Sequence, residues 1–324
     1  MRKISFSEAT LEAMVEEMAR DERVFVMGED IARQGGIFGQ FKGLPQQFGF
    51  DRVRDTPISE TAIVGAGVGA AMAGMRPVVD MHFADFITVP MDEVVNQMAK
   101  IRFMFGGQCT IPLVLRAPDG IVRSAAAQHS QSLESWFMHV PGLKVVIPSN
   151  PADAKGLLKA AIRSDDPVLY FEHKALFAQK GPVPEGEHIV PIGKANVVRA
   201  GKDVTIISYS LMMQRALEAA EKLSSEGINA EVIDLRTISP LDKETIFKSV
   251  AKTKRLVIVH EAVKIGGVGA EIAAMVAEEM IDCLDAPIKR LGAPFVPIPF
   301  SPSLERLVKV NTEDVVAAVK EICP

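Results

Sequence analysis

A chain of 324 residues, 48 % of them hydrophobic and 24 % charged, is too long for one ordinary hydrophobic core and has the composition of a globular protein. Extended disorder and a coiled coil are therefore excluded as its main structure. The net charge of −5 comes without any block of five or more consecutive lysines and arginines. The chain thus lacks the basic patch expected of a protein that binds nucleic acid or an anionic membrane.

The N-terminus, the cysteines and the longest apolar run favour an intracellular protein. No apolar stretch of a secretory signal separates Arg2 from Glu8. Residues 62–75 form the longest uncharged apolar run, which is short for a membrane span. The cysteines lack the spacing of metal ligands and are expected to be free thiols (Cys109, Cys283 and Cys323). We expect a cytoplasmic protein, or one of the mitochondrial matrix after processing in a eukaryote.

Helices and buried strands are predicted to alternate in the first part of the chain. Ser5 and Glu8 form a capping box ahead of apolar residues at helical spacing. Apolar runs without alternation are typical of strands covered on both faces, and therefore of a parallel sheet flanked by helices. Such runs are found at 24–27, 111–115, 145–147 and 168–171, and a helical pattern is found at 153–162.

A second, smaller domain is predicted after a stretch rich in proline and glycine. This stretch places a linker at 181–195, between domains at 1–180 and 196–324. Strands at 204–209, 230–235 and 256–260 then alternate with helices at 213–224, 242–252 and 270–281. The predicted fold class is α/β, with two domains that each contain a mostly parallel sheet flanked by helices.

Two glycine clusters resemble dinucleotide-binding loops. Residues 65–70 fit the pattern G-x-G-x-x-G/A, but residues 54–61 before them cannot form the buried strand that this motif requires. We interpret them as a helix whose small residues allow close packing. The glycines of residues 266–269 lack the third small residue at position 272. The hypothesis of a nicotinamide-binding oxidoreductase would therefore rest on the first cluster alone.

Two residues are candidates for acid–base chemistry. Glu60 begins the glycine-rich helix, where an apolar neighbourhood would raise the pKa of its carboxyl group toward neutrality. It could equally be a helix N-terminal acid stabilised by the helix dipole. His129 lies among small and polar residues, which suits a loop that faces a cavity. A hydrogen-bonded structural histidine remains the alternative there.

Several motifs in fixed order resemble the β subunits of the thiamine-diphosphate-dependent decarboxylase component of 2-oxo acid and acetoin dehydrogenase complexes, in the transketolase superfamily. The resemblance covers essentially the whole chain. It implies that residues 1–180 bind the aminopyrimidine of thiamine diphosphate and that residues 196–324 form a transketolase C-terminal-like assembly domain. The motifs lie at residues 28–30, 35–36, 52–60, 85–86, 129–131, 141–148, 153–158, 239–242 and 285–287.

The resemblance also assigns roles to individual residues. Glu60 matches the glutamate that hydrogen-bonds ring nitrogen N1′, and an acid there makes the 4′-amino group more acidic. Phe86 matches the aromatic residue against the pyrimidine, and Ile58 is an apolar neighbour of that ring. His129 matches a histidine that aids proton transfer to the substrate and the lipoyl group. A monovalent cation, K⁺, is implied at backbone carbonyls (Leu113, Ala161, Ile162, Ser164 and Asp166).

A missing motif implies a partner. Thiamine-diphosphate enzymes hold the diphosphate through Mg²⁺ with Gly-Asp-Gly followed by asparagine, and no Gly-Asp-Gly occurs in this chain. The resemblance therefore implies an α subunit that supplies the Mg²⁺ site, an α₂β₂ heterotetramer, and a lipoyl acyltransferase core as a further partner.

The alternative from another class is a non-catalytic subunit that only docks the acyltransferase core. Glu60 and His129 argue against it, since a scaffold needs neither. For the substrate, residues 103–107 and 125–133 resemble enzymes of acetoin slightly more than those of pyruvate, and branched-chain enzymes less. Pyruvate or acetoin is therefore expected.

Overall fold

The computed structural model describes residues 2–323. The chain divides into two compact units, which are treated separately below. Unit 1 comprises Met1–Asp119 and Trp136–Ile192, and unit 2 comprises Gly120–Ser135 and Gly193–Pro324. Residues 120–135, which the sequence analysis includes in the first domain, are therefore part of unit 2. Among residues 2–323, no helix combines the length and apolar character needed to cross a bilayer.

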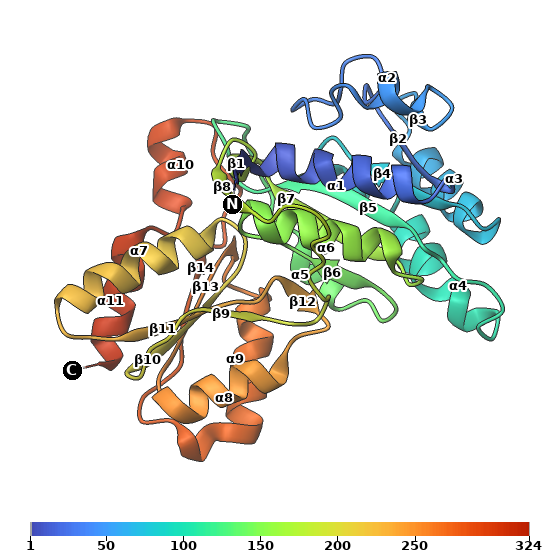
Figure 1. Ribbon diagram of the computed structural model, residues 1–324. Helices are drawn as coiled ribbons and strands as arrows, with labels where there is room; N and C mark the ends of the chain where they lie inside the picture. Colours follow the sequence, from blue (N-terminus) through green and yellow to red (C-terminus); the bar gives the residue numbers. More distant parts are fainter. Residues whose placement is uncertain (1, 324) are drawn as a thin grey trace. The chain divides into compact units, whose positions relative to one another are not determined.

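Unit 1 is built around a parallel sheet in the strand order β6-β7-β5-β4-β2-β3 (Figure 1). The longer strands consist entirely of buried residues. The predicted parallel sheet with covered faces is therefore confirmed. The strands are β2 (Val24–Gly28), β3 (Val53–Asp55), β4 (Arg76–Asp80), β5 (Val114–Asp119), β6 (Lys144–Val146) and β7 (Val168–His173).

Helices cover both faces of this sheet. Val78 and Val114 face a core formed with α1 (Phe6–Arg20) and α6 (Pro151–Arg163), whereas the next residue, Val79, packs against α3 (Glu60–Met72) on the other face. α1 begins at the predicted capping box. The remaining elements of unit 1 are α2 (Leu44–Phe48), η1 (Ala84–Thr88), η2 (Glu93–Met98), α4 (Ala99–Met104) and η3 (Lys174–Leu176). The short helix α5 (Glu134–Met138) contains residues assigned to both units.

The first glycine cluster lies inside α3 and not in a strand-to-helix turn. A Cβ atom on Gly67 would lie 2.7 Å from Val79 Cγ2 and 3.0 Å from Leu113 Cδ1. Glycine is therefore needed for α3 to approach the sheet this closely. The close-packing interpretation is confirmed, and the dinucleotide-loop alternative is wrong for this segment.

Much of the expected linker packs against unit 1. β8 (Lys180–Val183) pairs antiparallel with β1 (Arg2–Ser5). The Val190 side chain belongs to the core around α6, and its N–H donates to the Gly156 carbonyl at 3.2 Å. Proline and glycine thus mark an irregular segment here, but its apolar side chains still bury against the first unit.

The core of unit 1 contains a buried ion pair. Arg116 on β5 donates to the Glu172 carboxylate on β7 through Nε at 2.8 Å and Nη2 at 2.9 Å, and both side chains are essentially inaccessible to solvent. The guanidinium also stacks 4.8 Å from the Phe41 ring centroid. Two parallel bonds to a buried guanidinium make this pair a strong determinant of how β5 and β7 align.

Replacing Glu172 with glutamine should destabilise the chain by about 3–5 kcal/mol, because it leaves the Arg116 charge buried without its counterion. Denaturant unfolding followed by circular dichroism measures the change. The control is Glu321→Gln, which removes an exposed pair with Lys289 and should cost at most about 1 kcal/mol. Equal small effects in both variants would contradict the assigned role of the buried pair.

Unit 2 contains a sheet in the order β14-β13-β10-β11-β9, in which only β9 runs antiparallel to its neighbour among the described strands (Figure 1). The predicted strands and helices of this region are all present, with ends shifted by three residues at most. The elements are β9 (Asn196–Arg199), β10 (Val204–Ser208), α7 (Met212–Ser225), β11 (Ala230–Asp234), β12 (Thr237–Ser239), α8 (Lys243–Thr253), β13 (Leu256–Val263), α9 (Val268–Met280), η4 (Ile281–Cys283), β14 (Lys289–Ala293), α10 (Pro302–Val308) and α11 (Thr312–Ile322).

Candidate active site

The sheet of unit 1 has a topological switch point between β2 and β4. The chain leaves β2 toward β3 on one side, and it leaves β4 toward β5 on the other. The connections after the two strands therefore diverge at their carboxyl ends. In open α/β sheets, ligands bind in the crevice that such a divergence creates.

Acidic residues gather at this switch point. Glu29 directly follows β2 and is only 9 % exposed. The Nδ1 atom of His82, which follows β4, lies 3.3 Å from the Glu29 carboxylate, and its Nε2 atom lies 2.9 Å from the Glu29 carbonyl oxygen. Glu60, half-buried at the start of α3, lies close enough for its charge to act on Glu29.

The surroundings raise the pKa of two acids at the carboxyl ends of β2 and β4, Glu29 and Asp80. Burial raises the pKa of Glu29, the Glu60 carboxylate raises it further, and His82 opposes the shift. Burial also raises the pKa of Asp80, the last residue of β4, to about 8, against the opposing charge of Arg116. A carboxyl group whose pKa lies near neutrality, as that of Asp80 does, can give up and take back a proton at neutral pH.

The two predicted ring contacts lie in unit 1 with Glu60. Ile58 is 82 % exposed two residues before Glu60, although it is a large apolar residue. Phe86 lies in η1 and is half-buried; its ring packs edge to face on Phe83 at 5.9 Å between centroids. An exposed isoleucine two residues from an acid, and a half-buried aromatic ring, are side chains of the kinds that suit a flat, partly polar heterocycle.

His129 belongs to unit 2 and is half-buried. The structure thus brings Glu60 together with Glu29 and His82, while His129 lies in the other unit with residues 120–135.

The five carbonyls predicted to bind a monovalent cation already accept hydrogen bonds. Arg76 donates to Ile162 O at 2.9 Å and to Ser164 O at 2.7 Å, so a cationic side chain occupies two of them. Protein N–H and O–H groups donate to the carbonyls of the other residues (Leu113, Ala161 and Asp166). The set fits a monovalent cation only if Arg76 shares its two carbonyls with that ion.

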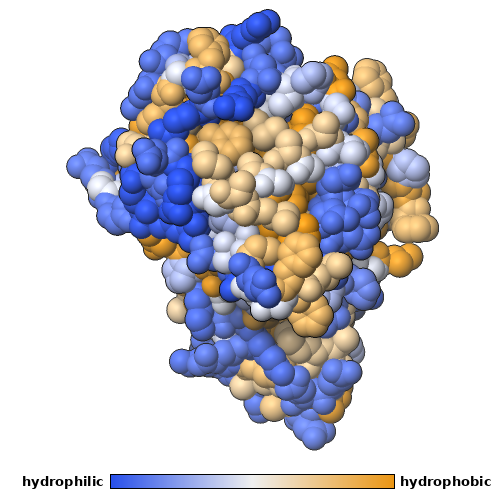
Figure 2. Space-filling model, turned by 90° about the vertical axis from the view of Figure 1, so that its right-hand side faces the viewer, coloured by the Kyte–Doolittle hydropathy of each residue, from blue (hydrophilic) through white to orange (hydrophobic). Residues whose placement is uncertain are grey.

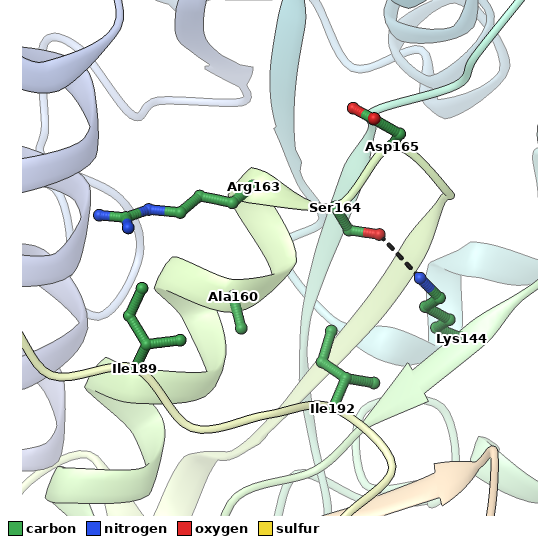
Figure 3. Close-up of a pocket in the computed structure, with 7 residues that line it drawn as sticks. All are labelled: Lys144, Ala160, Arg163, Ser164, Asp165, Ile189 and Ile192. Atoms are coloured by element: carbon green, nitrogen blue, oxygen red, sulfur yellow. Dashed lines mark hydrogen bonds between the residues drawn. The ribbon is translucent and has the colours of Figure 1, made fainter.

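A hollow of about 360 Å³ lies beside the C-terminal end of α6 (Figure 3). Lys144 points into it and donates to Ser164 Oγ at 3.0 Å. Arg163 points away toward α1, where it pairs with Glu17 at 2.6 Å. Because Lys144 also pairs with Asp166 at 3.0 Å, the cations around this hollow are already neutralised.

Sequence reasoning missed Glu29 and His82 as site residues. Glu29 lies in the motif at residues 28–30, directly after the strand predicted at 24–27. This position was the available signal. His82 carries no such signal, because its role depends on β4 lying beside β2, and no local pattern specifies that pairing.

Family comparisons agree with this architecture. Residues 2–179 match the model described as transketolase, pyrimidine binding domain, and residues 193–315 match transketolase, C-terminal domain. A solved structure, a split-gene transketolase in an inactive β4 tetramer, superposes with a TM-score of 0.82 at 24 % identity, over 99 % of this chain and 98 % of that one. The two units therefore define a transketolase-type α/β protein, which confirms the predicted fold class.

Curated relatives narrow the class further. The chain is 49 % identical to the 2-oxoisovalerate dehydrogenase subunit beta of Bacillus subtilis, with 99 % of each chain covered. It is 48 % identical to the acetoin:2,6-dichlorophenolindophenol oxidoreductase subunit beta of Cupriavidus necator, over 99 % of this chain and 97 % of that one. For the pyruvate dehydrogenase E1 component subunit beta of Rhizobium meliloti, identity is 46 % over 100 % of this chain and 70 % of the relative. This chain belongs to the family of dehydrogenase β subunits that these relatives represent, as its motifs predicted.

Proposed function

We propose that this chain is the β subunit of a thiamine-diphosphate-dependent dehydrogenase that acts on a 2-oxo acid or acetoin and passes the acyl group to lipoyl groups. The observation that carries the proposal is the pair Glu29 and Glu60 at the switch point of unit 1, within the segment that matches a pyrimidine-binding domain. Unit 2 serves assembly in this proposal.

The residues at the switch point fit the pyrimidine half of thiamine diphosphate. Glu60 offers a carboxyl group to ring nitrogen N1′, and Phe86 and Ile58 offer apolar surface to the ring. When bound, thiamine diphosphate supplies the electron sink for cleavage next to the substrate carbonyl. Glu29, whose pKa is raised by burial, is a second carboxyl group close to Glu60 that could exchange a proton there.

The diphosphate half needs a partner in this proposal. The chain has no Gly-Asp-Gly motif, and we propose that an α subunit supplies the Mg²⁺ site within an α₂β₂ heterotetramer. The subunit names of the relatives support such a partner. We further propose a lipoyl acyltransferase core as the second partner. A monovalent cation at the five carbonyls remains a prediction.

Exposed apolar side chains support an extensive interface. In unit 1, Phe103 of α4 is 88 % exposed, and Met104 beside it is also exposed. Figure 2 shows hydrophobic residues gathered over much of the face that lies to the right in Figure 1, the side of α4. Exposed patches of this kind usually mark protein–protein contacts.

The proposal is tested by reconstitution with an α subunit from the same source. We expect turnover that requires both subunits and thiamine diphosphate, followed as reduction of dichlorophenolindophenol. Pyruvate or acetoin should be used in preference to 2-oxoisovalerate, since residues 103–107 and 125–133 resemble enzymes of the first two more closely.

The control for reconstitution is each subunit alone. Turnover unaffected by thiamine diphosphate would overturn the proposed function, and so would turnover by the α subunit alone at the full rate. The second of these results would instead favour the non-catalytic docking subunit. A clear preference for 2-oxoisovalerate would overturn the substrate assignment only.

A further inference from the structure

We propose that unit 2, besides serving assembly, contributes to catalysis by positioning, because buried carboxylates of this unit hold the loop that carries His129. Glu261 and Glu305 are the positioning residues in this inference. The inference rests on the proposed function, because the position of His129 affects turnover only if His129 takes part in the reaction. The loop comprises residues 120–135, here called the His129 segment.

The backbone of the His129 segment is strained. Arg123, Ser124 and Ala126 have φ angles of +41°, +59° and +60°, in the left-handed region that residues with a Cβ atom rarely adopt. Three such residues within four positions persist only where the surroundings determine the conformation. Strain of this kind gathers at functional sites, so the contacts that maintain it are informative.

Two carboxylates supply those contacts at the strained end of the segment. Ile121 N–H donates to Glu261 Oε1, in β13, at 2.7 Å. Ser124 N–H donates to Glu305 Oε2, in α10, at 2.8 Å, so one of the strained residues is held directly. Both acids are buried, and hydrogen bonds from N–H groups to ionised carboxylates are about twice as strong as neutral ones.

The other end of the segment is also tied to unit 2. Tyr209, directly after β10, donates its hydroxyl to Glu134 Oε1 at 2.6 Å, and both residues are buried. Gly120 N–H donates to Gln131 O at 3.3 Å and closes the base of the loop. His129 therefore lies between two anchored ends, and its placement depends on side chains far away in the sequence.

Glu305 is itself held in place. Lys309, directly after the end of α10, pairs with the second carboxylate oxygen of Glu305. This pair helps to hold the Glu305 side chain in place beside the segment. The geometry is that of a support for the loop, because the Glu305 carboxylate accepts a hydrogen bond from a backbone N–H group of the segment.

The first measurement needs no activity. Arg123 is exposed in the strained stretch, so trypsin cleavage after it reports opening of the segment in the full chain. We expect Glu305→Ala to accelerate this cleavage about tenfold or more, and Glu305→Gln, which keeps an acceptor oxygen, to lie between it and the wild type. The matched control is Glu313→Ala, which removes a glutamate of the same unit that pairs with Lys222.

The second measurement uses the reconstituted complex. Glu305→Ala and Glu261→Ala should each lower kcat about 10- to 100-fold, because a loop displaced by about 1 Å costs that much, whereas the KM for thiamine diphosphate should stay unchanged. Glu313→Ala should change neither constant. If an alanine variant fails to fold, Glu305→Gln and Glu261→Gln give the same comparison.

The outcomes separate this inference from the proposed function. Unchanged cleavage after Arg123 in the Glu305 variants overturns the inference, and so does faster cleavage with an unchanged kcat. His129→Ala tests the proposed function: it should lower kcat without changing cleavage. A His129→Ala complex with full kcat overturns the catalytic role of that histidine, whatever the Glu305 variants do.

Discussion

Glu60→Gln is expected to lower turnover of the reconstituted enzyme by about 10²–10⁴-fold, the usual contribution of a general acid–base group. Glutamine keeps the size of the side chain and its capacity for hydrogen bonding, but it cannot exchange a proton with a ring nitrogen. The neighbouring Glu29 would remain, but it could not take the place of a carboxyl group at position 60. The measurement is kcat at saturating thiamine diphosphate, together with a thermal melt of the variant.

A matched control distinguishes this role from a helix-end effect. Glu244 also lies in the first turn of a helix, α8, and is largely exposed. Glu244→Gln removes a carboxylate from the positive end of a helix dipole, a change worth about 0.3–1 kcal/mol in stability. We expect it to leave kcat unchanged. If Glu60→Gln behaves like Glu244→Gln, then Glu60 is a helix N-terminal acid and the catalytic assignment is wrong.

The isolated chain is expected to bind thiamine diphosphate weakly or not at all, and addition of the α subunit should produce tight, Mg²⁺-dependent binding. In the proposed function, Glu60, Phe86 and Ile58 of unit 1 would contact the pyrimidine. This chain has no Gly-Asp-Gly motif that could hold the diphosphate and its Mg²⁺.

Isothermal titration calorimetry measures this dependence. The chain alone, the α subunit alone and their mixture are each titrated with the cofactor, with Mg²⁺ and again with a chelator. The mixture should show a Kd at least 100-fold lower than that of either subunit alone. This ratio corresponds to about 2.7 kcal/mol of binding free energy. Tight Mg²⁺-dependent binding by the isolated chain would show that it contains the diphosphate site, contrary to the shared-site proposal.

Local sequence patterns predicted many elements of the fold. Continuous apolar runs identified β2, β6 and β7, because a strand covered on both faces needs apolar residues at every position. The run at 111–115 was misplaced, and β5 begins at Val114. Pro112 interrupts that run and cannot donate a backbone hydrogen bond to a sheet. β9 and β14 were not predicted, because they lie at the edges of their sheet and are only partly buried.

What the sequence alone determined is therefore the class of fold, the helical nature of the glycine-rich segment and, through its ordered motifs, the family. All three are properties of residues close together in the chain or of motifs in fixed order. Glu60 and Phe86 were also identified in this way as candidate site residues, on the resemblance of short motifs, and their roles stay predictions.

Only the tertiary structure decided which residues meet. Glu29 and His82 come together because β4 pairs with β2, and the buried bond between Arg116 and Glu172 exists because β5 pairs with β7. The attachment of the His129 segment to Glu305, 181 residues beyond Ser124, is of the same kind. Such contacts depend on strand order and on the energetic need of a buried carboxylate for donors, and neither leaves a periodic pattern in the chain.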